Sequence, residues 1–186
     1  ATVGPSATVR TLGGAPNTHP LGETYFSQTP YRFGDYVAKI QLAPVSDDLT
    51  ELEGQTIDTK DRPDALSEAV DNTMRDSHAR WELRVQLLRD VEAQPIEDAT
   101  VLWDEEVSPF VTVATVTAHA QPGWTEPRAD RVDDGMRFAP WNGIAAHRPM
   151  GSINRARNAT YDHSAKFRER FNRCPIHDPA SAELPG

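Results

Sequence analysis

Four residues near the end of the sequence are spaced so that they share one face of a helix. They are Arg157, Tyr161, Ala165 and Arg168, at positions i, i+4, i+8 and i+11. A tyrosine ligates ferric iron only as the phenolate, and the pKa of a free tyrosine is about 10. An arginine one turn away stabilises the phenolate through charge-assisted hydrogen bonds. This row of four residues, called the stripe below, therefore predicts either an iron site on this helix or a solvated polar face.

The other two residues of the stripe suit a flat macrocycle. Ala165 is small, so a planar group could approach the helix at that turn. Arg168 lies about 10 Å along the helix axis from Tyr161, given a rise of about 1.5 Å per residue. That is about the distance between a haem iron and its propionates, and tyrosine is a known axial ligand of haem iron. His147, in the loop ahead of the helix, either contacts the haem edge or fixes the loop.

The elements that must position this helix follow from hydrophobic periodicity and turn residues. We expect a hairpin with arms at Glu23–Gln28 and Asp35–Leu42 and a turn at Thr29–Gly34. The other expected elements are a helix over Asp64–Arg80, strands at Trp81–Arg89 and Pro109–His119, and a polar helix over Asn154–Phe171. Residues 46–63 and 120–135 are predicted loops, and His19 is a predicted loop residue. Four strands of this length do not close a barrel and leave two sheet edges unpaired.

Composition excludes several classes of function. The chain has 186 residues, with 28 acidic against 19 basic side chains and a net charge of -9, which disfavours nucleic acid and anionic membranes as partners. No apolar run reaches the 18 residues that a membrane span needs. A single cysteine, Cys174, excludes an internal disulfide framework and a cysteine zinc site. It fits a reducing compartment, so a cytoplasmic location is expected.

Five further stretches of the sequence stand in an order that points to a known domain. Arg168 follows Tyr161 by seven residues, and Arg157-x-x-x-Tyr161 is preceded by an F-x-P-x-N stretch ending at Asn142. Between Asn142 and Tyr161 lies the stretch AHRPMGSINRAR (146–157). Ahead of Asn142 are WELRVQ (81–86), GDYVAK (34–39) and FSQ (26–28). In this order they resemble the second half of the catalase domain, and more closely the small catalase-related haem proteins. The resemblance covers residues 19–170.

The resemblance implies a fold of the α+β class. It would be the second half of a catalase-type antiparallel β-barrel with helices, completed by an N-terminal half not present in this chain. The domain would span residues 19–172, with a loop or tail at 1–18 and a C-terminal tail at 173–186. The distal histidine and asparagine of catalases come from segments ahead of the hairpin, and none of the six histidines here lies in a similar motif.

The implied function is that of a haem-dependent oxidoreductase acting on hydrogen peroxide or an organic hydroperoxide. Haem b would be held by Tyr161, which ligates the metal, and by Arg157, Arg168, Ala165 and His147; Arg157 and Tyr161 would be the catalytic pair. A companion polypeptide carrying the distal half would complete the site, within an oligomer. The alternatives are a non-catalytic haem-binding or regulatory half-domain and a structural fragment that has lost its haem.

Overall fold

The computed structural model describes residues 15–179, and within them the chain forms two compact units. Unit 1 comprises residues 15–23, Pro44–Arg80 and Thr117–Gly123. Unit 2 comprises Thr24–Ala43, Trp81–Val116 and residues 124–179. No helix in this described part is long and apolar enough to cross a bilayer.

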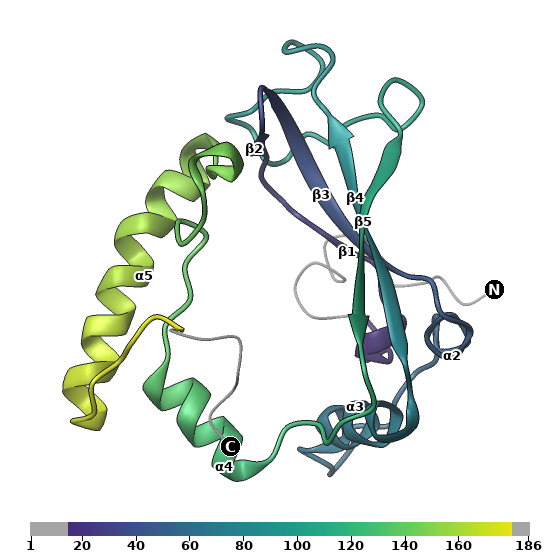
Figure 1. Cartoon of the computed structure of the whole chain (residues 1–186), viewed down its shortest axis with the longest axis vertical. Helices are drawn as coiled ribbons and strands as arrows, with labels where there is room; N and C mark the ends of the chain where they lie inside the picture. Colours follow the sequence, from purple (N-terminus) through teal and green to yellow (C-terminus); the bar gives the residue numbers. More distant parts are fainter. Residues whose placement is uncertain (1–14, 180–186) are drawn as a thin grey trace. The chain divides into compact units, whose positions relative to one another are not determined.

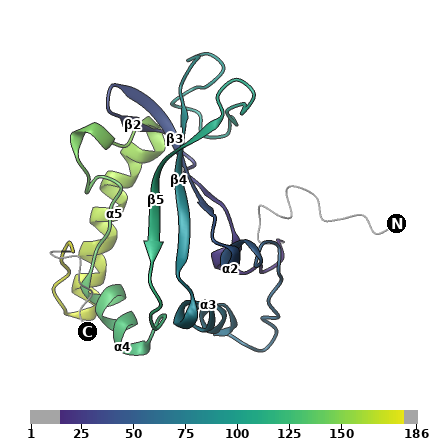
Figure 2. The same ribbon diagram turned by 45° about the vertical axis from the view of Figure 1, so that its right-hand side comes forward.

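A mixed sheet-and-helix architecture is present, as the sequence predicts (Figures 1 and 2). The strands are β1 (Tyr25–Phe26), β2 (Tyr31–Phe33), β3 (Tyr36–Pro44), β4 (Ala79–Leu87) and β5 (Phe110–Ala118). They form one sheet in the order β1-β3-β4-β5, and β2 also pairs with β3. Both short strands run antiparallel to β3, with Tyr25 opposite Leu42 and Tyr31 opposite Ala38. The α+β class with an antiparallel sheet is thus confirmed.

The hairpin turn is shorter than the sequence suggested. Phe33 pairs with Tyr36, so only Gly34 and Asp35 form the turn. Gly34 has φ +62°, a left-handed conformation that glycine adopts without steric cost. The predicted turn at Thr29–Gly34 was wrong because Tyr31 to Phe33 are strand-favouring residues that pair with β3 as β2. The first arm is therefore divided into β1 and β2, and the sheet has five strands instead of four.

Unit 1 contains η2 (Pro20–Gly22), α2 (Asp47–Thr50) and α3 (Ala65–Asp76). The helix α2 lies in the stretch 46–63 that we expected to be a solvated loop. Leu49 is fully buried there, at 0% exposure, and Ser46 is bonded to Arg80, so this acidic segment is docked on the protein. Helix α3 ends before the predicted Arg80, because Ser77 is already extended and β4 begins at Ala79.

His19 lies in a loop as expected, directly ahead of η2, but it is buried at 6% exposure. Its Nδ1 accepts a hydrogen bond from the Leu21 N–H at 3.3 Å, and so caps η2. Its Nε2 lies 3.2 Å from the Thr73 hydroxyl on α3. Burial lowers the pKa of His19, because removal from water disfavours the charged imidazolium. The neutral ring therefore joins η2 to α3.

Unit 2 contains α4 (Glu126–Ala129), η3 (Asp130–Asp134, a π-helical turn), η4 (Ala145–His147) and α5 (Gly151–Asn172). Both α4 and η3 lie within residues 120–135, so the prediction that this whole stretch is a loop was wrong. Thr125 at the N-cap and Pro127 in the first turn are typical helix-start residues that could have indicated α4. Helix α5 confirms the predicted polar helix and extends it at both ends.

A buried polar cluster closes the connection between β4 and β5. The Gln86 side-chain amide donates to the carbonyls of Trp103 and Ser108, at 3.0 and 2.9 Å. Lys39 on β3 donates to the Val101 carbonyl at 3.1 Å and lies 5.0 Å from the centre of the Trp103 ring. Burial lowers the pKa of Lys39. These bonds satisfy polar groups that would otherwise destabilise the interior.

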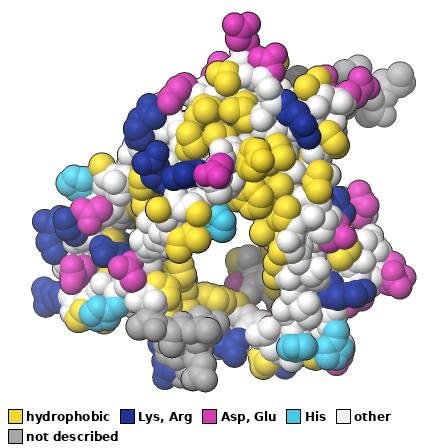
Figure 3. Space-filling model, turned by 45° about the horizontal axis from the view of Figure 1, so that its top comes forward, with side chains coloured by type: hydrophobic (Ala, Val, Ile, Leu, Met, Phe, Trp, Pro, Cys, Tyr) yellow, Lys and Arg dark blue, Asp and Glu magenta, His cyan; other side chains and the backbone are white. Residues whose placement is uncertain are grey.

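Strand β5 is exposed along its middle. Residues 111–117 are all exposed, including three valines. It is the last strand of the sheet order, so one of its edges has no strand partner among the described residues. Apolar side chains gather on part of the face shown in Figure 3.

Candidate functional site

The start of α5 is fixed by close backbone contacts. Met150 donates its N–H to the Pro30 carbonyl at 3.0 Å. Gly151 follows with φ +84°, and a Cβ at that position would lie 2.7 Å from the Ile96 carbonyl oxygen. A side chain would therefore be both conformationally strained and too close to backbone. Glycine at 151 lets the first turn of α5 pack directly against residues 95–97.

Asn154 is the main anchor of the first turns of α5. It is completely buried, and its Nδ2 donates to the Met150 carbonyl at 2.9 Å. The backbone carbonyl of Asn154 accepts from the Trp141 indole N–H at 2.7 Å. Its Oδ1 lies 3.5 Å from the Arg157 guanidinium. Asn154 thus holds both the loop ahead of the helix and the arginine of the stripe.

Tyr161 lies one turn beyond Arg157 and is 41% exposed. No hydrogen bond joins its hydroxyl to another residue in the part of the chain that the structure describes. Two hollows of about 180 and 350 Å³ border its ring, and both are also lined by Arg137 and Phe138. The phenol oxygen is therefore accessible and available to bind a further group.

The other two members of the stripe are already in contact with protein. Ala165 is buried at 4% exposure. The Arg168 guanidinium donates to the carbonyls of Asp133 and Met136, so it bonds the end of η3 and the segment after it. Arg168 also lines the larger hollow beside Tyr161. These contacts orient the second arginine toward the same side of α5 as the phenol.

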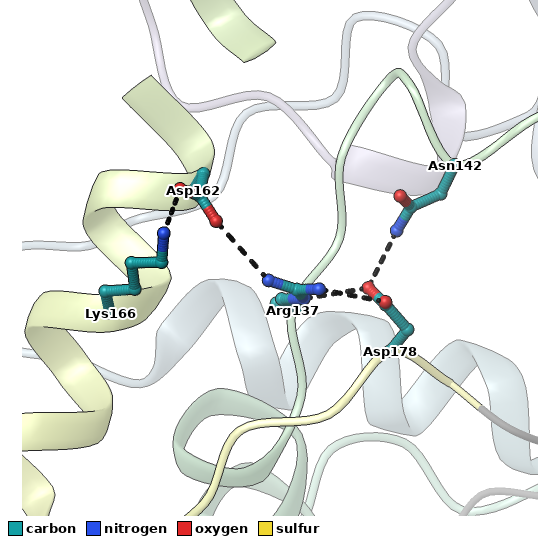
Figure 4. Close-up of polar contacts among 5 residues, drawn as sticks. All are labelled: Arg137, Asn142, Asp162, Lys166 and Asp178. Atoms are coloured by element: carbon teal, nitrogen blue, oxygen red, sulfur yellow. Dashed lines mark hydrogen bonds and ion pairs between the residues drawn. The ribbon is translucent and has the colours of Figure 1, made fainter. Parts of the chain in front are cut away.

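A charged cluster borders the smaller hollow (Figure 4). Arg137 forms a two-pronged ion pair with Asp178, at 3.0 and 3.2 Å, and lies 3.6 Å from Asp162 on α5. The Asn142 side-chain amide donates to Asp178 Oδ1 at 3.0 Å, the oxygen that also accepts from Arg137 Nε. The bonds with Arg137 lower the pKa of Asp178, and the bond with Lys166 lowers that of Asp162. The cluster holds the segment before η4 against both α5 and residues after it.

His147 lies elsewhere. Its exposed ring stacks on Phe33 with centroids 5.9 Å apart and planes 9° apart. It lines a different hollow, together with Tyr31, Ile40 and Val85, and does not border Tyr161. The structure therefore unites Tyr161 with Arg168 around one hollow, places Arg157 one turn away on Asn154, and leaves His147 apart.

Sequence reasoning missed two positioning groups. Asn154 was expected only as the first residue of a helix, although a buried asparagine within α5 turns out to hold Arg157. Asp178 was placed in a C-terminal tail, yet His177 pairs with Met136 and Asp178 binds Arg137. No local pattern signals either contact. Arg137 and Asp178 lie 41 residues apart in the sequence, and the role of Asn154 depends on its burial.

The residues present suit a haem in their donor chemistry. A haem needs one protein ligand on this side, and Tyr161 offers an accessible oxygen without a competing hydrogen-bond donor among the described residues. Arg157 and Arg168 on the same helix supply positive charge for a phenolate and for propionates. The two hollows flank Tyr161 on α5, one beside Asn158 and Asp162 and the other beside Thr160 and Ser164, so the described residues provide the ligand and part of a pocket wall.

Comparison with known proteins gives the fold. No protein-family model matches the chain, and no curated protein sequence matches it. Among solved structures, a fungal catalase matches 84% of this chain and 32% of its own, with a TM-score of 0.60 and 18% identity. Catalase A from Saccharomyces cerevisiae matches 84% of this chain and 33% of its own, with a TM-score of 0.64 and 16% identity.

The fold is therefore that of part of a catalase, and the resemblance drawn from the sequence is confirmed at the level of fold. The chain spans about a third of the length of the catalases that it matches.

Proposed function

We propose that this chain supplies the proximal half of a haem site in a catalase-type oxidoreductase, with Tyr161 as the axial ligand. The observation that carries the proposal is Tyr161 itself: an accessible phenol, on a helix that also carries Arg157 and Arg168, within a catalase-like fold. Bound haem would supply the redox chemistry toward hydrogen peroxide or an organic hydroperoxide.

The chain's own residues would act by binding and orientation. Tyr161 would lose its proton on ligation, and Arg157, positioned by Asn154, would stabilise the resulting negative charge. Arg168 would direct its remaining N–H groups to a propionate at the rim of the larger hollow. Ala165 is covered by other residues at 4% exposure, so it would contribute to the packing of this turn of α5.

The proposal includes a second polypeptide segment that carries the distal residues and covers the open side. Support comes from β5, whose exposed valines and unpaired edge among the described strands provide a surface for another strand. This segment would contribute the acid–base groups for peroxide. Without it the site would bind haem but lack turnover, which is the rival function of a haem-binding half-domain.

Substitution of Tyr161 tests the ligand directly. In the 186-residue chain purified together with the proposed second segment, Tyr161→Phe should abolish ferric iron ligation, seen as loss of the high-spin charge-transfer band and of bound haem. Arg157→Ala should retain haem with shifted bands and about 10–100-fold lower activity, as for other groups that support a metal ligand. Tyr36→Phe, an exposed tyrosine on β3, is the matched control.

Two outcomes separate the alternatives. A wild-type spectrum at full haem occupancy in Tyr161→Phe would contradict the ligand assignment. A normal haem spectrum without oxygen release or substrate oxidation on addition of peroxide would favour the non-catalytic half-domain.

A further inference from the structure

Two histidines from distant parts of the sequence meet on the surface of unit 1. His78 lies between α3 and β4, and His119 directly follows β5. Their ring centroids are 5.8 Å apart and their planes are inclined by 75°. Both side chains are exposed. Neither belongs to the site around Tyr161, and neither was assigned a role from the sequence.

The backbone on both sides of this pair is held in place. Ser77 donates its N–H to the Thr73 carbonyl at 3.1 Å, which fixes the end of α3 beside His78. Gln121 donates its N–H to the Met74 carbonyl at 2.8 Å, and its side-chain amide donates to the His119 carbonyl at 3.2 Å. The two imidazoles are therefore brought together by a fixed backbone, while the exposed rings themselves can rotate rapidly.

We propose that His78 and His119 form a binding site for a divalent transition-metal ion such as Zn²⁺ or Cu²⁺. Imidazole nitrogens are favoured ligands of both ions. An ion about 2.0–2.1 Å from one nitrogen of each ring requires centroids roughly 5–6 Å apart, so only ring rotation is needed. No group of three His, Cys, Asp or Glu suited to a metal occurs in residues 15–179. Water would fill the remaining coordination positions.

Such an ion would link the end of α3 to the segment after β5. Because the ion binds the folded arrangement of both rings and not the unfolded chain, it would stabilise unit 1 by mass action. Ligating imidazoles must be neutral, so binding should weaken as the pH falls. The site is independent of haem, since its residues do not contact Tyr161 or the hollows beside it.

The test is a titration of the untagged full-length chain with ZnCl₂ at neutral pH, by calorimetry and by thermal unfolding. We expect one bound ion per chain and a higher melting temperature at excess Zn²⁺. His78→Ala and His119→Ala should each weaken binding by about tenfold or more, since each removes one of two ligands. His163→Ala removes an exposed histidine of α5 and should bind as the wild type does.

NMR of the imidazole signals avoids reliance on the variants. In the wild-type chain, substoichiometric Zn²⁺ should shift the signals of His78 and His119 before those of the other four histidines. The proposal is overturned if either single variant binds Zn²⁺ as the wild type does. It is also overturned if zinc perturbs all histidines equally.

Discussion

Strands β3 and β5 are nine residues long and belong to one sheet, yet they differ in burial. β3 has four buried residues, two of them polar: Lys39 and Gln41. β5 consists of apolar residues and threonine, and none of its side chains is buried. β3 has strands on both edges, whereas β5 ends the sheet order. Burial here is decided by the neighbours of a strand more than by its composition.

This difference also shows where the described residues form a complete core and where they do not. Around β3, the buried polar side chains have partners: Lys39 donates to the Val101 carbonyl, and Gln41 accepts from the Arg84 guanidinium. Around β5, β-branched residues suited to a packed sheet remain in solvent. Substitutions near β3 should therefore affect folding, and substitutions on β5 should affect association with the proposed second segment.

The largest expected effect is at Trp103, which is 5% exposed and covers Lys39. Trp103→Ala should lower the free energy of unfolding by about 3–5 kcal/mol, because it creates a cavity and exposes a buried lysine. Trp124→Ala, at 46% exposure, should change it by about 0.5 kcal/mol. Guanidinium unfolding followed by far-UV circular dichroism measures both. Equal losses of unfolding free energy at the two tryptophans would contradict the proposed difference between the buried surroundings of β3 and the exposed surface.

A matched pair of valines sharpens the comparison between strands. Val85→Ala on β4, at 3% exposure, should cost about 2 kcal/mol, from roughly 0.8 kcal/mol per methyl-sized group and a cavity term. Val113→Ala on β5, at 42% exposure, should cost about 0.5 kcal/mol in the chain alone. In the presence of the second segment, unfolding should become sensitive to Val113. If Val113→Ala stays neutral in that complex, the open face of β5 is not where the segment binds.

The smallest effect concerns His19 in unit 1. Its pKa is lowered by burial, so the unfolded chain takes up a proton at a higher pH than the folded chain does. Stability should therefore fall as the pH drops below about 6.5, the ordinary histidine value. His19→Gln should flatten this part of the pH profile, whereas His163→Gln should not. Urea unfolding at pH 7.5 and 5.5 gives the comparison; a profile unchanged by His19→Gln would show that other groups set it.

Much of the architecture was readable from the sequence because periodicity survives in long elements. The nine-residue strands and the helix α5 were found within a few residues of their bounds. Short elements were not: α2, with one buried leucine, and α4 were assigned to loops. Their formation depends on docking of a single turn, and periodicity needs several turns to be recognisable.

Only the part of the candidate site that lies on one helix, α5, was predictable from the sequence. The i, i+4 and i+11 spacing identified Arg157, Tyr161 and Arg168 as sharing a helix face. The carbonyls that hold Arg168 and the pairing of Arg137 with Asp178 depend on contacts between distant segments. His147 was a candidate because it lies near α5 in sequence, yet its stacking on Phe33 takes it to another hollow.

Gly151 has a consequence for how tolerant this chain is to sequence change. Its missing Cβ sets the start of α5 against the Ile96 backbone, so the requirement exists in the folded chain whatever group it binds. Tyr161, by contrast, has no described hydrogen-bond partner and is 41% exposed. In a library selected only for folded protein, glycine at 151 would be retained while position 161 drifted; selection for haem would fix both. The two positions thus face different requirements: backbone geometry constrains position 151, and only the proposed ligation would constrain position 161.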